Sequence, residues 1–145
     1  MQTDDLLRLN GESFVLFGRR EHRAQVRTSL LAGAEEDGYR VTNLSQFSRP
    51  KTIVERLDRL VEESVIENPT LEPWGGEWRL YVVTDPGHTS SHSFGQSFRD
   101  ELACVMRLSP VTGIVVAMEC DRSPSSFAGL RHVEVSWRGG LSAAG

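Results

Sequence analysis

Apolar and polar positions alternate along the chain in blocks that predict strands and helices in turn. Short apolar runs that end at glycine, proline or charged residues are typical of buried strands. They predict strands over 13–18, 39–44, 78–84, 113–118 and 131–137. Apolar residues at three- and four-residue steps predict helices over 20–37, 50–65 and 97–108. Strands that alternate with helices are joined by parallel crossovers, so we expect an α/β fold: a flavodoxin-like open parallel sheet of about five strands with helices on both faces.

The chain has 145 residues, the size of one domain. We expect a leader or linker over 1–12, one domain over 13–137 and a flexible tail over 138–145. A net charge of −4 does not suggest a nucleic-acid partner, and no apolar run is long enough to cross a bilayer. Cys104 and Cys120 make no disulfide framework, and both lie in segments that are predicted to be core. We therefore expect a cytoplasmic protein with no membrane partner.

Polar clusters follow three of the predicted strands. They are Gly18-Arg19-Arg20, Ser45-Gln46-Phe47-Ser48 and Thr84-Asp85. In open parallel sheets, ligands bind outside the carboxyl ends of the strands, near the point where the strand order reverses. The three clusters therefore predict a binding site at that edge of the sheet.

Glu101 is the carboxylate that most needs an explanation. On a helical wheel with Phe98 at 0°, Glu101 falls at about 300°, next to Leu108 at about 280° and inside an apolar arc. An acid on the buried side of a helix costs several kcal/mol unless it has partners or a function. Glu101 is thus either a catalytic acid or a buried acid that is paired with an arginine such as Arg99 or Arg19.

Metal and serine-hydrolase chemistry are both disfavoured by the motifs present. His88 and His92 are four residues apart, but they lie in a segment rich in serine and histidine that is predicted to be a loop, without the carboxylate of a zinc helix. Gly95-Gln96-Ser97-Phe98 lacks the second glycine of a nucleophile elbow. We expect no metal site.

Five short matches along the chain carry a family resemblance. They are Phe14–Arg19, Leu44–Glu55, Tyr81–Pro86, Asp100–Ala103 and Met118–Val135. In this order they resemble the Toll/interleukin-1 receptor (TIR) domain, and most closely the bacterial nucleotide-binding branch of anti-phage effectors.

The resemblance implies that the domain hydrolyses NAD and releases nicotinamide, with NAD as substrate and no other cofactor. Glu101 would stabilise the oxocarbenium-like transition state. Arg19 and Arg20 would bind phosphate, and Phe47 would stack on a flat ring. The remaining residues expected to bind the nucleotide are Gly18, Ser45, Asp85 and Ser97. The resemblance also implies self-association through the loop that holds Phe47, and a possible separate sensor protein.

Two other functions stay open. One is a non-catalytic TIR interaction module, which assembles with like domains. The other is an N-glycosidase of the nucleoside deoxyribosyltransferase kind, which also uses a carboxylate near a strand end. Release of nicotinamide from NAD would distinguish the three.

Overall fold

The computed structural model describes residues 9–44, 49–85, 95–122, 125–136 and 140–144. Its centre is a six-stranded sheet with the order β2-β3-β4-β1-β5-β6. The strands are β1 (Phe14–Gly18), β2 (Arg40–Asn43), β3 (Arg79–Thr84), β4 (Ile114–Cys120), β5 (Arg131–Val135) and β6 (Leu141–Ala144). The helices are α1 (Arg20–Glu36), α2 (Pro50–Glu67), α3 (Gln96–Arg107), α4 (Ser109–Thr112) and the short 3₁₀ helix η3 (Ser125–Phe127).

Strands β1 to β5 are all parallel, which confirms the predicted open α/β sheet. β1 pairs with β4 on one side and with β5 on the other. In flavodoxin itself the strand order is 2-1-3-4-5, so the first strand lies between the second and the third. Here β1 lies between β4 and β5 instead. The connection from β4 to β5 therefore passes over β1.

β6 is a strand that the sequence pattern did not predict. It pairs antiparallel with β5, with Val135 opposite Leu141 and Val133 opposite Ala143. Within the expected tail over 138–145, residues 141–144 thus form a strand. The segment Leu141-Ser142-Ala143-Ala144 is short and has no β-branched or aromatic residue, so its pairing comes from the open edge of β5 and not from a strong strand pattern of its own.

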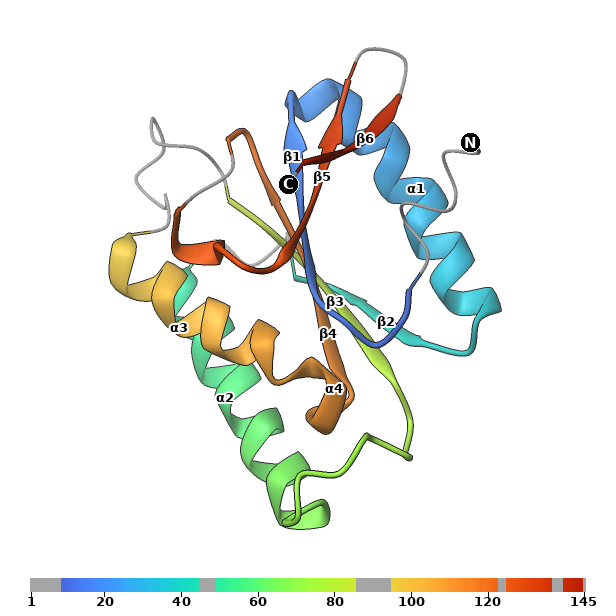
Figure 1. The fold of residues 1–145 in the computed structure, drawn as a ribbon. Helices are drawn as coiled ribbons and strands as arrows, with labels where there is room; N and C mark the ends of the chain where they lie inside the picture. The colour runs from blue at the N-terminus through green and yellow to red at the C-terminus, as the bar shows by residue number, and fades with distance from the viewer. Residues whose placement is uncertain (1–8, 45–48, 86–94, 123–124, 137–139, 145) are drawn as a thin grey trace.

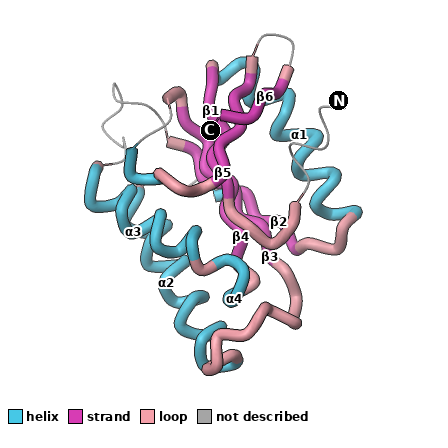
Figure 2. The backbone as a smooth tube through the Cα atoms, viewed as in Figure 1, coloured by secondary structure: helices cyan, strands magenta, loops and turns pink. Residues whose placement is uncertain are grey.

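The helices cover both faces of the sheet (Figures 1 and 2). α1 packs on one face, where Val26, Leu30 and Ala34 meet the side chains of β1, β4 and β5. α2, α3 and η3 pack on the other face, around Leu57, Leu102 and Phe127. The handedness of the crossovers explains this division. The chain from β1 to β2 crosses the sheet in one direction, and the chain from β2 through β3 to β4 returns in the other.

Within the described ranges, no helix is both long and apolar enough to span a membrane.

Candidate functional site

The connections that leave β1 and β4 depart to opposite faces of the sheet. β1 leads into α1 on one face, whereas β4 leads to η3 on the other. These two strands are neighbours. The carboxyl ends of two adjacent strands with opposite exits form a crevice that open α/β sheets use for ligands.

A hollow of about 390 Å³ lies at this position. We call it the switch-point crevice; it is lined by Gly18, Arg19, Arg20, Glu21 and Asp121. Its size falls within the range of about 300–1,000 Å³ that is usual for small-molecule sites. Gly18 is required here, because a Cβ atom would lie 2.4 Å from the carbonyl oxygen of Val135, at a φ of +144°. The crevice thus contains the first of the three predicted polar clusters.

The first turn of α1 adds hydrogen-bond donors to the crevice. Arg19 is the N-cap residue of this helix, and its side chain makes no capping hydrogen bond. The first N–H groups of a helix have no partner within the helix, and they carry the positive end of its dipole. Arg19 and Arg20 are both exposed. Glu21, also exposed in this turn, is a negative charge at the same wall.

Behind the crevice lies a network of buried charges that sequence reasoning missed. Arg23 is only 1% exposed. It donates from Nε to the Gly18 carbonyl oxygen at 2.9 Å and from Nη2 to Asp121 at 3.0 Å, and its Nη1 lies 3.4 Å from Glu119. Arg27 donates from Nε and Nη2 to the two oxygens of Glu119, which raises the pKa of Arg27 further above its usual value. The bidentate pair fixes Glu119 in place.

The charged side chains at the carboxyl ends of β1 and β4 include more arginines than carboxylates. Crevice and network together hold four arginines against three carboxylates. Arg23 joins the two walls, because it contacts Gly18 at the end of β1 and Asp121 just after β4. The sequence did carry a signal for it: Arg23 lies three residues before Val26, one helical turn along the stripe of Val26, Leu30 and Ala34, and therefore on the buried face of α1.

The other predicted site residues do not join this crevice. Asp85 is buried at the end of β3, where its Oδ2 lies 3.6 Å from Nη2 of Arg99, and β4 separates it from β1. Ser97 is exposed in the first turn of α3. Ser45, Phe47, His88 and His92 lie outside the described residues.

The prediction that Glu101 faces the core is wrong, since this residue is exposed. The buried side chains of α3 are Leu102, Ala103, Val105 and Met106. Ala103 extends the apolar arc away from Glu101, and Leu108, which extended it toward Glu101 on the wheel, ends the helix and is 38% exposed. Arg99, offered as a partner for Glu101, pairs with Asp85 instead.

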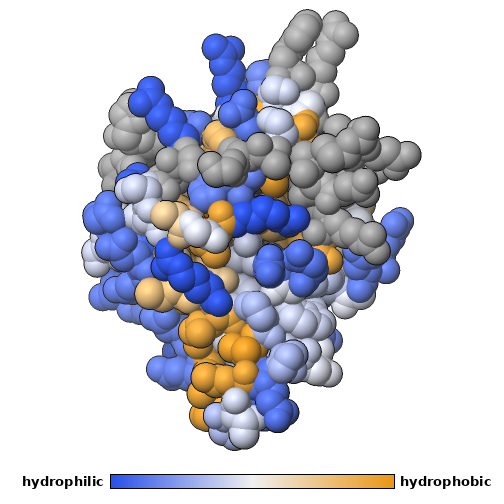
Figure 3. Space-filling view, in the orientation of Figure 1, coloured by the Kyte–Doolittle hydropathy of each residue, from blue (hydrophilic) through white to orange (hydrophobic). Residues whose placement is uncertain are grey.

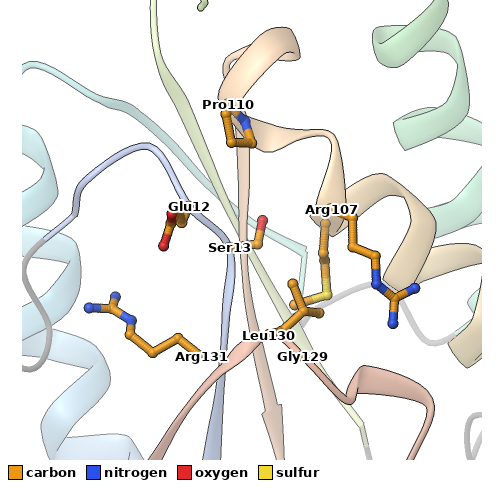
Figure 4. Close-up of a pocket in the computed structure, with 8 residues that line it drawn as sticks. Glu12, Ser13, Arg107, Pro110, Gly129, Leu130 and Arg131 are labelled. Carbon is orange, nitrogen blue, oxygen red and sulfur yellow. The ribbon is translucent and has the colours of Figure 1, made fainter.

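A second hollow, of about 230 Å³, lies at the opposite edge of the sheet (Figure 4). Two of its polar side chains already have partners: Ser13 hydrogen-bonds Ser109 and the Val116 N–H, and Arg107 donates to the carbonyl oxygens of Ser126 and Ala128. Burial lowers the pKa of Arg131 in its wall, and the nearby Glu12 carboxylate opposes that shift. Figure 4 shows Arg107 pointing away from Ser13. This hollow is also smaller than the switch-point crevice and lies below the usual size of a small-molecule site, so it is the weaker candidate for a ligand.

The two cysteines lie in different environments, and the expectation that both belong to the core is wrong for Cys104. Cys104 is exposed on α3, whereas Cys120 is buried at the end of β4. Burial raises the pKa of the Cys120 thiol from 9.0 to about 12. A thiol with such a pKa stays protonated and unreactive at neutral pH.

Among the described residues, no three His, Cys, Asp or Glu side chains are grouped so that they could hold a metal ion. Comparisons of the chain with family models, with curated proteins and with solved structures found no match.

Proposed function

We propose that this chain binds a phosphate-bearing nucleotide in the switch-point crevice, and that the nucleotide is NAD, which the domain cleaves with release of nicotinamide. The observation that carries the binding step is the position of the crevice between β1 and β4, whose connections leave to opposite faces. The choice of NAD and the cleavage step come from the resemblance to TIR domains.

Phosphate recognition is supported by the groups that line the crevice. Arg19 and Arg20 are exposed and can reorient toward a bound anion. An arginine guanidinium group can donate two parallel hydrogen bonds to two oxygens of one phosphate. Arg20 and Glu21 of the first turn of α1 line the same crevice, and the backbone N–H groups at the start of a helix favour an anion. The excess of one arginine over the carboxylates favours an anionic ligand.

Removal of both exposed arginines tests the binding step. We expect the Arg19→Gln, Arg20→Gln double variant to fold normally and to weaken NAD binding by at least about tenfold, measured by calorimetric titration, because two charge-assisted contacts are lost. Arg59→Gln, an exposed arginine on α2, is the matched control. Equal affinity in the double variant and the control would mean that the phosphate does not bind in the crevice.

The cleavage step is tested at Glu101. If Glu101 acts as the acid that the resemblance implies, Glu101→Gln should nearly abolish nicotinamide release. Because Glu101 is exposed, the same variant should leave the thermal midpoint unchanged, so a loss of activity would not be a loss of fold. A variant with wild-type activity would show that Glu101 is not the catalytic acid. No nicotinamide release from the wild-type chain would contradict NAD cleavage itself.

A non-catalytic interaction module is the second candidate, and one surface feature favours it. Large apolar side chains are exposed at Val65, Ile66, Leu71 and Leu108. Figure 3 shows apolar surface gathered at the lower end of the molecule, near α4 and the C-terminal end of α2. Exposed apolar patches of this kind are typical of contact surfaces between proteins.

A further inference from the structure

We infer that Asp121 determines which nucleotides the switch-point crevice accepts, by binding the 2′- and 3′-hydroxyl groups of a ribose whose phosphate lies against Arg19 and Arg20. This inference rests on the proposed function, because it assumes that a phosphate binds in the crevice. It adds a recognition element on the opposite wall and assigns Arg23 a positioning role.

Asp121 lies on the wall of the crevice opposite Arg19 and Arg20. Asp121 follows β4 directly, whereas Arg19 and Arg20 follow β1, so the two kinds of group face the crevice from opposite sides of the switch point. A phosphate held at the β1 wall places the rest of the nucleotide toward the β4 wall. Asp121 is the carboxylate that the described residues offer on that wall of the crevice.

The Asp121 carboxylate is accessible to a ligand. Asp121 is 55% exposed, and Arg23 contacts its Oδ1 at 3.0 Å. A carboxylate has about four acceptor positions over its two oxygens, so one contact from Arg23 leaves room for further donors. A ribose diol presents two adjacent O–H donors, and an ionised acceptor makes the stronger class of hydrogen bond with them.

A buried arginine, Arg23, holds the Asp121 carboxylate in place. Arg23 is buried, and its Nε donates to the Gly18 carbonyl oxygen while its Nη2 contacts Asp121. Glu119 lies between Arg23 and Arg27 and neutralises the buried charge. Arg23 thus fixes the distance between the phosphate wall and the carboxylate wall. Lysine would keep the charge but has no planar fork, so it cannot make both contacts in the same way.

The experiment compares three ligands by calorimetric titration: AMP, 2′,3′-dideoxy-AMP and inorganic phosphate. We expect the wild-type chain to bind AMP at least about tenfold more tightly than dideoxy-AMP, because the hydrogen bonds to a charged acceptor are lost in the analogue. Asp121→Asn should abolish most of this preference while its affinity for inorganic phosphate stays equal or increases, since a negative charge beside the phosphate is removed. Asp58→Asn, an exposed aspartate on α2, is the matched control.

Arg23→Lys tests the positioning role. It should reduce the preference for AMP and leave binding of inorganic phosphate within about threefold of wild type, whereas a purely structural defect would weaken all three ligands together. Asp121→Asn carries the test if Arg23→Lys does not fold, because Asp121 is half exposed.

The outcomes separate the inference from the proposed function. Binding of phosphate and AMP with no preference over dideoxy-AMP, or a full preference in Asp121→Asn, would overturn the role of Asp121 and leave the phosphate site standing. No binding of AMP or phosphate to the wild-type chain would overturn both.

Discussion

Glu119 is a buried charge that two arginines neutralise. It is 1% exposed and receives hydrogen bonds from Arg27 and Arg23, of which Arg23 is equally buried. We expect Glu119→Gln to lower the free energy of unfolding by about 3 kcal/mol, because it removes the counter-charge of Arg27 and one of the two counter-charges of the buried Arg23. Urea denaturation measures the loss. Glu36→Gln, an exposed glutamate at the end of α1, should change the stability by less than about 0.5 kcal/mol. Similar values for both variants would contradict the role of Glu119.

Cys120 makes the stability depend on pH in the alkaline range. Its thiol ionises near 9.0 in the unfolded chain and at about 12 in the folded chain. The unfolded state therefore loses this proton first, and the free energy of unfolding should fall as the pH rises through this window. Denaturation at several pH values above 9 measures the slope, which we expect to be less steep in Cys120→Ala than in Cys104→Ala. Equal slopes would show that Cys120 does not contribute.

The same two thiols give a simpler measurement at one pH. A thiol reagent should modify Cys104 rapidly in the folded protein and Cys120 only after denaturant is added, since Cys104 is exposed and Cys120 is buried. Rapid modification of two thiols in the folded chain would contradict the burial of Cys120.

At the scale of elements, helix α1 contains a glycine that the fold does not need. Gly33 has ordinary helical geometry, and a Cβ atom added to it meets nothing within 4 Å. Gly33→Ala should raise the free energy of unfolding by about 0.5–1 kcal/mol, because alanine loses less backbone entropy in a helix. Gly113→Ala is the contrast: its Cβ would lie 2.3 Å from the Trp74 ring at a φ of +72°, so we expect a loss of about 1–3 kcal/mol. Thermal and urea denaturation of both variants test this pair.

The elements were also the level at which the sequence was most informative. Periodicity depends on neighbours along the chain, so β1, α1 and α2 begin and end close to their predicted positions. β6 was missed because its strand pattern is weak and its pairing partner is β5. The position of β1 between β4 and β5 was not predicted either, because pairing between distant strands leaves no periodic signal.

The sequence predicted only part of the candidate site, because contacts between distant residues leave no periodic signal. Gly18, Arg19 and Arg20 were found because they directly follow a strand, and the carboxyl ends of parallel strands share one edge. Asp121 and Arg23 enter the site through contacts between residues almost a hundred positions apart. Glu101 was placed in the core because the wheel treated Leu108 as part of the buried face, although the helix ends there.

At the scale of the whole molecule, two regions are candidates for the contact surface of the self-association that the resemblance implies. One is the loop that holds Phe47, which the resemblance implies. The other is the apolar end of α2, where Ile66 is 78% exposed. α2 begins at Pro50, shortly after Phe47 in the sequence, and runs for eighteen residues to Glu67, so nearly the whole helix lies between Phe47 and Ile66 along the chain. A substitution at one end can therefore be tested without disturbing the other.

We expect nicotinamide release to rise more than linearly with protein concentration, because assembly at the loop would complete the site. Phe47→Ala should suppress this dependence, and Ile66→Gln, which removes an exposed apolar side chain at the other candidate surface, should not. Specific activity over a hundredfold dilution, together with sedimentation velocity on the same samples, measures both. Loss of the dependence in Ile66→Gln alone would place the contact at the end of α2, which is the arrangement that an interaction module would use. Constant specific activity in all three proteins would indicate that the crevice works within a single chain, and the arginines of α1 would then have to hold the nucleotide without a neighbour.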